Sequence, residues 1–114
     1  RRKIPYAPGC GSASEIAQAE ELGVEIVKMF PGSEVGGPSF VKGMLGPCPW
    51  TSIMPTGGVD ATRESLQAWF DAGVACVGIG SKLLTKELLA AGDWGALTAK
   101  VRGVVDTIRE IRGA

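Results

Sequence analysis

The stretch VEIVKMFPG, residues 24–32, is an apolar run that ends in a turn and carries a lysine near that end. Side chains alternate between the two faces of a strand, so Lys28 shares a face with the apolar residues Val24, Ile26 and Phe30. The stretch is therefore predicted to be a buried strand, with a lysine that projects from a mostly apolar surface near its carboxyl end.

Three other short apolar runs end in turns rich in Gly or Pro, and a helical segment follows each: Ile4–Ala7, Ser52–Met54 and Ala75–Ile79. The strand-end residues Lys28, Thr56 and Ser81 are 28 and 25 residues apart, which suits one strand and one helix each. Such alternation predicts an α/β fold of four parallel β/α units. Periodicity leaves open whether these units form half of an eight-unit barrel or an open sheet with helices on both faces.

Capping signals and apolar periodicity predict the helices. The first begins with the capping box Ser12-x-x-Glu15 and stops at Gly23. The others are a short helix at residues 38–45, one capped by Asp60 that stops at Gly73, short turns within residues 81–92, and a long amphipathic helix from Asp93 to Arg112. The long helix places apolar residues on one face: Leu97, Val101, Val104, Val105, Ile108 and Ile111.

Composition limits the classes of function. The chain has 114 residues, of which 45% are hydrophobic, and 12 basic residues balance 12 acidic ones, which suits one domain with no nucleic-acid partner. No apolar run approaches the roughly 20 residues of a membrane span. The three cysteines have no histidine to complete a zinc site, so we expect reduced thiols in a cytoplasmic protein. The first strand begins almost at residue 1, so residues 1–114 are expected to be one domain and a piece of a longer chain.

The lysine at the strand end is the candidate for chemistry. Catalytic groups in parallel β/α barrels gather at the carboxyl ends of the strands. An apolar surround disfavours the ammonium relative to the neutral amine, and a neutral amine is what attacks a carbonyl to form a Schiff base. The alternative is a lysine that extends into solvent or pairs with Glu25 or Glu34.

Two glycine-rich turns follow the third and fourth strands. In MPTGG, residues 54–58, Thr56 closes a strand and two glycines leave the backbone amides unobstructed. In GIGS, residues 78–81, a short helix is expected directly afterwards. Unpaired backbone amides at such turns bind phosphate well. Many barrels bind phosphate between the loops of two successive strands, so together the turns predict a phosphate site.

Four segments in this order and spacing are similar to the second half of a bacterial family: PYAPGCGSASEI, EIVKMFPGS, IMPTGGV and VGIGSKLL. The family comprises the 2-keto-3-deoxy-6-phosphogluconate (KDPG) and 4-hydroxy-2-oxoglutarate (KHG) aldolases, class I enzymes on a (β/α)₈ TIM barrel. The resemblance covers essentially the whole chain. It implies that residues 1–114 are a single (β/α)₄ half-barrel, a fragment of a full-length aldolase barrel.

The resemblance assigns roles to residues that match the family motifs. Lys28 stands where the family has its Schiff-base lysine. The residues implied to bind substrate are Phe30 and Pro31 beside the pyruvate, then Thr56, Gly57 and Gly58. The residues implied to bind phosphate are Gly57, Gly58, Gly80 and Ser81.

The implied activity is a lyase reaction of carbohydrate metabolism, in the Entner–Doudoroff pathway. The lysine condenses with a keto acid, and the imine accepts electrons as a C–C bond breaks, which yields pyruvate and glyceraldehyde 3-phosphate or glyoxylate. No metal or organic cofactor is implied. The partners implied are a small, phosphorylated keto acid and further copies of the chain in a trimer, with no nucleic acid and no membrane.

One departure from the family concerns proton transfer. The family takes a general acid/base glutamate and a carboxylate-binding arginine from the first half of its barrel, and no stretch here matches them; Glu34 does not match the base. The full-length chain is thus expected to be the enzyme and the 114-residue piece to be inactive. Two alternatives are a self-associating half-barrel and a non-catalytic phosphate-binding module.

Overall fold

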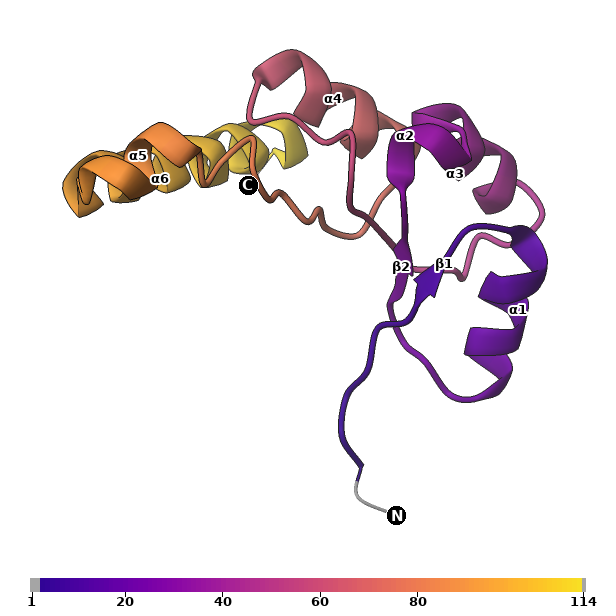
Figure 1. The fold of residues 1–114 in the computed structure, drawn as a ribbon. Helices are drawn as coiled ribbons and strands as arrows, with labels where there is room; N and C mark the ends of the chain where they lie inside the picture. Colours follow the sequence, from indigo (N-terminus) through magenta and orange to yellow (C-terminus); the bar gives the residue numbers. More distant parts are fainter. Residues whose placement is uncertain (1–2, 114) are drawn as a thin grey trace.

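The computed structural model describes residues 3–113, which form three short parallel strands and six helices (Figure 1). The strands are β1 (Gly9–Cys10), β2 (Val27–Met29) and β3 (Ile53–Pro55), and they pair in that order. Lys28 in the central strand lies opposite Gly9 on one side and Met54 on the other. The predicted parallel α/β fold is confirmed.

The helices are α1 (Ala13–Glu21), α2 (Gly32–Val35), α3 (Gly37–Leu45), α4 (Arg63–Ala72), α5 (Lys86–Ala91) and α6 (Trp94–Arg112). The predicted capping of α1 is confirmed, because Ser12 Oγ accepts the Glu15 N–H at 3.2 Å. The Glu15 carboxylate accepts the Gly11 N–H at 2.9 Å. Gly23 follows the helix with a φ of +90°, a conformation that glycine adopts freely.

Helix α4 begins two residues later than Asp60 alone would predict. Its N-cap is Thr62, whose Oγ1 accepts the Ser65 N–H at 3.2 Å. The prediction of Asp60 as the cap was wrong because this carboxylate faces the Lys82 ammonium at 4.0 Å, while the Asp60 N–H donates to Ser65 Oγ at 3.0 Å.

The predicted first strand, Ile4–Ala7, is an exposed extended segment, and the strand forms later, at β1. Pairing with β2 begins at Pro8, whose carbonyl accepts the Lys28 N–H at 3.0 Å. The prediction was wrong because an apolar segment becomes a strand only where a partner strand pairs with it. The pairing with β2 extends only as far as Pro8.

The predicted fourth strand, Ala75–Ile79, makes a single parallel bridge, between Gly78 and Thr56. The N–H groups of Ala75 and Gly78 donate to carbonyls of β3 residues at 2.9 Å. Two such bonds hold the segment beside β3 without extending into a regular ladder. Among the described residues, the fourth unit therefore contributes an extended segment and not a strand.

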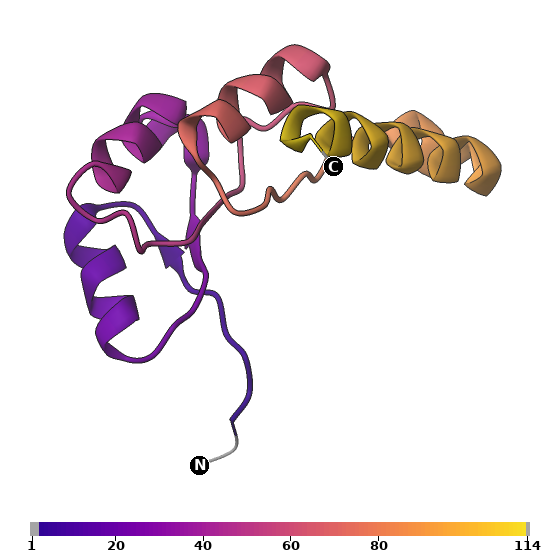
Figure 2. The same ribbon diagram turned by 180° about the vertical axis from the view of Figure 1, so that it is seen from behind.

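The core lies between the strands and one layer of helices. Val27, Met29 and Ile53 are at most 1% exposed, and they pack with buried residues of the helices: Ile16, Ala19, Val41, Met44, Leu66, Trp69 and Ala72. Both views show α1, α3 and α4 following an arc around one side of the strands (Figures 1 and 2). No described helix covers the opposite face of the sheet. The described residues therefore do not form the alternative fold, an open sheet with helices on both faces.

Helix α6 is amphipathic, as predicted, and the Asp93 carboxylate caps it by accepting the Ala96 N–H at 3.0 Å. Its apolar face is only partly buried: Val104 lies in the core, but Val101 and Val105 are 37% and 40% exposed. The reason is visible in both views, where α5 and the first half of α6 extend beyond α4 (Figures 1 and 2). Within residues 3–113, no helix has the length and hydropathy that crossing a membrane requires.

The Thr51–Glu20 hydrogen bond links the segment before β3 to α1. Thr51 is 5% exposed, and its hydroxyl donates to the Glu20 carboxylate at 3.1 Å. Thr51→Val keeps the shape but removes the donor, so the free energy of unfolding in urea is expected to fall by about 1–2 kcal/mol. Thr98→Val is the control, because this exposed hydroxyl bonds only the Trp94 carbonyl of its own helix. An equal loss in both variants would contradict the expectation.

Burial, followed by the negative charge of Glu15, raises the pKa of the Cys10 thiol above its ordinary value of 9.0. Above about pH 9 the unfolded state releases the thiol proton while the folded state keeps it. The contribution of the protonated thiol to the free energy of unfolding is therefore complete below about pH 9 and is lost as the pH rises through the folded pKa. In urea denaturation between about pH 8 and pH 10.5, Cys10→Ala is expected to lose stability less steeply than the unaltered chain. Parallel slopes would contradict this assignment.

Candidate active site

Lys28 lies in β2, on the face that the described helices leave uncovered. Its neighbours Val27 and Met29 point into the helix-covered core, while Lys28 itself is half-buried on the other face. Its ammonium nitrogen lies 4.9 Å from the centroid of the Phe30 ring, a favourable cation–π distance. Phe30 and Ile26 on this face are 50% and 39% exposed, so the described residues do not enclose Lys28 in a dry pocket.

Two backbone hydrogen bonds join the loop after β2 to the loop after β3. The Gly32 N–H donates to the Thr56 carbonyl at 2.8 Å, and the Ser33 N–H donates to the Gly57 carbonyl at 3.2 Å. A Cβ on Gly32 would lie 2.6 Å from the Gly57 carbonyl oxygen, so only glycine permits this approach. The loop that follows the lysine strand and the first glycine-rich loop therefore form one unit.

Gly57 and Gly58 have φ angles of +87° and +74°, in the left-handed region that glycine adopts without strain. A Cβ on Gly58 would collide with the Ser33 side chain. Gly57 lies against Phe30 and Pro31, because a Cβ there would be 3.6 Å from the Phe30 ring and 3.6 Å from Pro31 Cα. The structure thus brings the predicted pyruvate-pocket residues and the first predicted phosphate loop into contact.

Thr56 extends the strand face that carries Met54, the residue opposite Lys28. It is half-buried and forms the bridge to Gly78, where an added Cβ would lie 2.5 Å from Thr56 Oγ1. The absence of a side chain at Gly78 therefore lets the threonine hydroxyl lie against the fourth segment.

Gly80 and Ser81 follow this bridge by two and three residues, and both are exposed. The Gly80 carbonyl accepts the N–H groups of Leu83 and Leu84, each at 2.9 Å, so a single turn follows the motif. The helix expected directly after GIGS begins instead at Lys86. The two glycine-rich loops are linked by the Thr56–Gly78 bridge, in which the Gly78 N–H donates to the Pro55 carbonyl at 2.9 Å, and by the Lys82–Asp60 ion pair.

The polar groups around Lys28 are few. Across residues 3–113, neither Glu25 nor Glu34 lies within ion-pair distance of its ammonium, so the predicted alternative of a lysine–glutamate pair does not form. The same residues hold no cluster of three His, Cys, Asp or Glu side chains arranged to bind a metal ion.

Sequence reasoning missed Gly32 and Ser33. Their contribution is a pair of backbone N–H groups, and a backbone donor has no residue-type signature. The one available signal was the glycine directly after Phe30 and Pro31, which marks a place where another backbone can approach closely.

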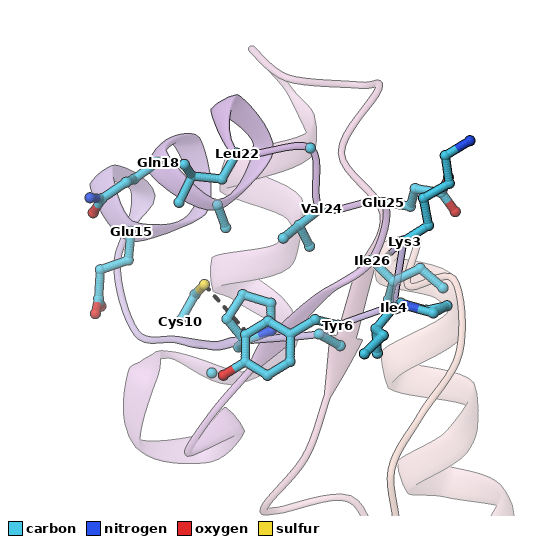
Figure 3. A pocket seen from close by; sticks show the side chains of 16 residues that line it. Lys3, Ile4, Tyr6, Cys10, Glu15, Gln18, Leu22, Val24, Glu25 and Ile26 are labelled. Carbon is cyan, nitrogen blue, oxygen red and sulfur yellow. Dashed lines mark hydrogen bonds between the residues drawn. The ribbon is translucent and has the colours of Figure 1, made fainter. Parts of the chain in front are cut away.

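A groove of about 860 Å³ lies elsewhere, along the free edge of β1 (Figure 3). The extended N-terminal segment with Tyr6 forms one wall, and α1 with Gln18 and Leu22 forms the other. None of the predicted site residues lines it. The candidate site is therefore an open sheet face and its loops, not this groove.

Gly32→Ala tests the junction of the two loops. Its methyl group would force the Gly57 carbonyl away, and the free energy of unfolding in urea is expected to fall by about 1–3 kcal/mol. Gly43→Ala in α3 is the matched control, since nothing lies within 4 Å of a Cβ there, and this change is expected to stabilise the helix by about 0.5–1 kcal/mol. An unchanged stability of Gly32→Ala would show that the loops are not held at this point.

Comparison with known proteins confirms the resemblance seen in the motifs. A family model described as "Aldolase: KDPG and KHG aldolase" matches residues 1–100. The 2-dehydro-3-deoxy-phosphogluconate aldolase of Haemophilus influenzae is 34% identical over 106 residues, which cover 93% of this chain and 49% of the relative. The 2-dehydro-3-deoxy-6-phosphogalactonate aldolase of Escherichia coli is 39% identical over 88 residues, which cover 73% of this chain and 42% of the relative.

A solved structure agrees with these relatives. The KDPG aldolase from Legionella pneumophila, with pyruvate captured as a covalent carbinolamine intermediate, superposes with a TM-score of 0.80 and 29% identity. The match covers 91% of this chain and 50% of that one, so this chain spans about half the length of the proteins it matches. With the family model spanning the lysine strand and both glycine-rich loops, the chain belongs to the KDPG and KHG aldolase family.

Proposed function

We propose that residues 1–114 form the second half of a (β/α)₈ barrel and carry the Schiff-base lysine of a class I aldolase. The observation that carries this proposal is the position of Lys28. It lies in the central strand, on the uncovered face and beside Phe30. The loop that follows this strand is hydrogen-bonded to the Gly57–Gly58 loop. A keto acid bound on this face would have an amine at its carbonyl and backbone amides toward its phosphate.

Two observations support the half-barrel. The helices follow an arc on one side of the strands, and the other side is open (Figures 1 and 2). The fourth segment continues the parallel order through the Thr56–Gly78 bridge. Full-length relatives have about twice the length of this chain, which suits four further β/α units that close the barrel over the open face.

The reaction follows from the lysine amine. It attacks the keto carbon of KDPG or KHG, and loss of water gives an imine that is protonated on nitrogen. As the hydroxyl two carbons from the iminium carbon loses its proton, the bond between its carbon and the carbon next to the iminium breaks; that electron pair enters the iminium to form an enamine, and an aldehyde leaves. The enamine takes up a proton on carbon, and water releases pyruvate and restores the amine.

The remaining residues would hold the substrate. Phe30 and Pro31 would lie beside the pyruvate portion, and Thr56 would contact the substrate between its two ends. The phosphate would lie at the amides of Gly57, Gly58, Gly80 and Ser81. The acid/base glutamate and the carboxylate-binding arginine would come from the other half of the barrel, in a cytoplasmic trimer as the family resemblance implies.

Trapping with borohydride tests the role of Lys28. A full-length chain that contains these residues, incubated with excess pyruvate and borohydride, is expected to gain one reduced pyruvyl group at Lys28, read by peptide mass spectrometry. Lys28→Ala should abolish the adduct, and Lys42→Ala, an exposed lysine of α3, should leave it intact. Cleavage of KDPG by this piece alone is expected to be slower by about 10²–10⁴-fold, because no acid/base group is positioned.

The result that would overturn the aldolase proposal is the absence of an adduct on Lys28, in this piece and in a full-length chain that contains it. Binding of inorganic phosphate without any adduct would point instead to the non-catalytic phosphate-binding module.

A further inference from the structure

The loop after β3 presents three successive backbone N–H groups, those of Gly57, Gly58 and Val59. Within residues 3–113 none of these three makes a regular hydrogen bond to a protein acceptor, although the Gly57 N–H faces the Gly78 carbonyl at the Thr56–Gly78 bridge. A trans peptide group is planar, so each N–H points away from the carbonyl of the residue before it. The direction of all three donors is therefore set by whatever holds the preceding carbonyls.

Each of those carbonyls is bonded to the body of the protein. The carbonyls of Thr56 and Gly57 accept the backbone N–H groups of Gly32 and Ser33. The carbonyl of Gly58 accepts the indole N–H of Trp69, at 3.4 Å. Two of the three anchors are thus backbone groups, and the third is a side chain that substitution can remove.

Trp69 is built into α4 and is 2% exposed. The edge of its ring also contacts the loop after β2, because Trp69 Cη2 lies 3.4 Å from where a Cβ on Gly32 would be. One buried side chain therefore contacts both loops that adjoin Lys28 and the first glycine pair. Because Trp69 belongs to α4, holding the Gly58 carbonyl at its indole points the Val59 N–H away from that helix.

We propose that Trp69 is a positioning residue that sets the affinity of this loop for phosphate by directing the Val59 N–H at the anion. The inference rests on the phosphate site of the proposed function and deepens it. Successive backbone N–H groups whose preceding carbonyls are held in place can bind an anion, as backbone nests do. Loss of the indole donor frees the Gly58–Val59 peptide to rotate, and the third donor is then no longer held in place.

Trp69→Phe removes the indole N–H while keeping an aromatic ring in the core. Titration of the ¹⁵N-labelled chain with inorganic phosphate is expected to shift the amide signals of Gly57, Gly58 and Val59. In Trp69→Phe, phosphate binding should weaken by about tenfold, the worth of one good hydrogen bond. The Val59 response should be lost, while that of Gly57, which the Gly32 anchor orients, remains.

Trp94→Phe is the matched control, because Trp94 is 62% exposed at the start of α6 and should leave both the affinity and the Val59 response unchanged. A purely structural role of Trp69 would lower the urea midpoint yet leave the affinity and the Val59 response of the folded variant intact, and that result would overturn the proposal.

Two further outcomes are decisive even where Trp69→Phe does not fold. If phosphate shifts Gly57 and Gly58 but not Val59 in the unaltered chain, the assignment to Trp69 is wrong and the phosphate site stands. If none of the three amides responds, both the phosphate site and this inference fail, while pyruvate trapping on Lys28 decides the aldolase proposal independently.

Discussion

The close approach of two loops at Gly32 is the constraint on which the site depends. Its N–H reaches the Thr56 carbonyl at 2.8 Å, and the space between the backbones leaves no room for a side chain. This contact joins the loops at the carboxyl ends of β2 and β3. Lys28 lies in β2 with Phe30 directly after it, and Gly57 follows β3, so backbone contacts set where the lysine strand lies relative to the Gly57 loop.

Local signals in the sequence predicted the elements whose causes are local. Ser12, Gly23 and Asp93 act within one helical turn, and each performs the capping role that its type indicates. The outer segments were different, because strand formation at Ile4–Ala7 and Ala75–Ile79 depends on a neighbour that periodicity does not reveal. Apolar alternation predicts which face of a segment is buried, but the position of the partner strand determines where the hydrogen-bond ladder begins.

The candidate site divides in the same way. Lys28 was predictable, because the strand period places it opposite Val27 and Met29, and the burial of those two residues confirms that division of faces. The glycines were predictable as turns that expose amides. The groups that orient those amides were not, since Gly32 acts through its backbone, and the apolar periodicity of Trp69 indicates only a buried position.

The two tasks of the proposed site, phosphate binding and carbonyl capture, therefore depend on different parts of the protein. In the proposed site, anion binding uses backbone amides of the Gly57–Gly58 loop and of Gly80 and Ser81, and the three groups that anchor the first of these loops lie within residues 31–69. Capture of a carbonyl by Lys28 needs a surround that excludes water, and the half-exposed Phe30 beside it shows that the described residues leave this face open. Phosphate affinity should thus be a property of this chain alone, whereas the reactivity of the amine depends on whatever packs over the open face.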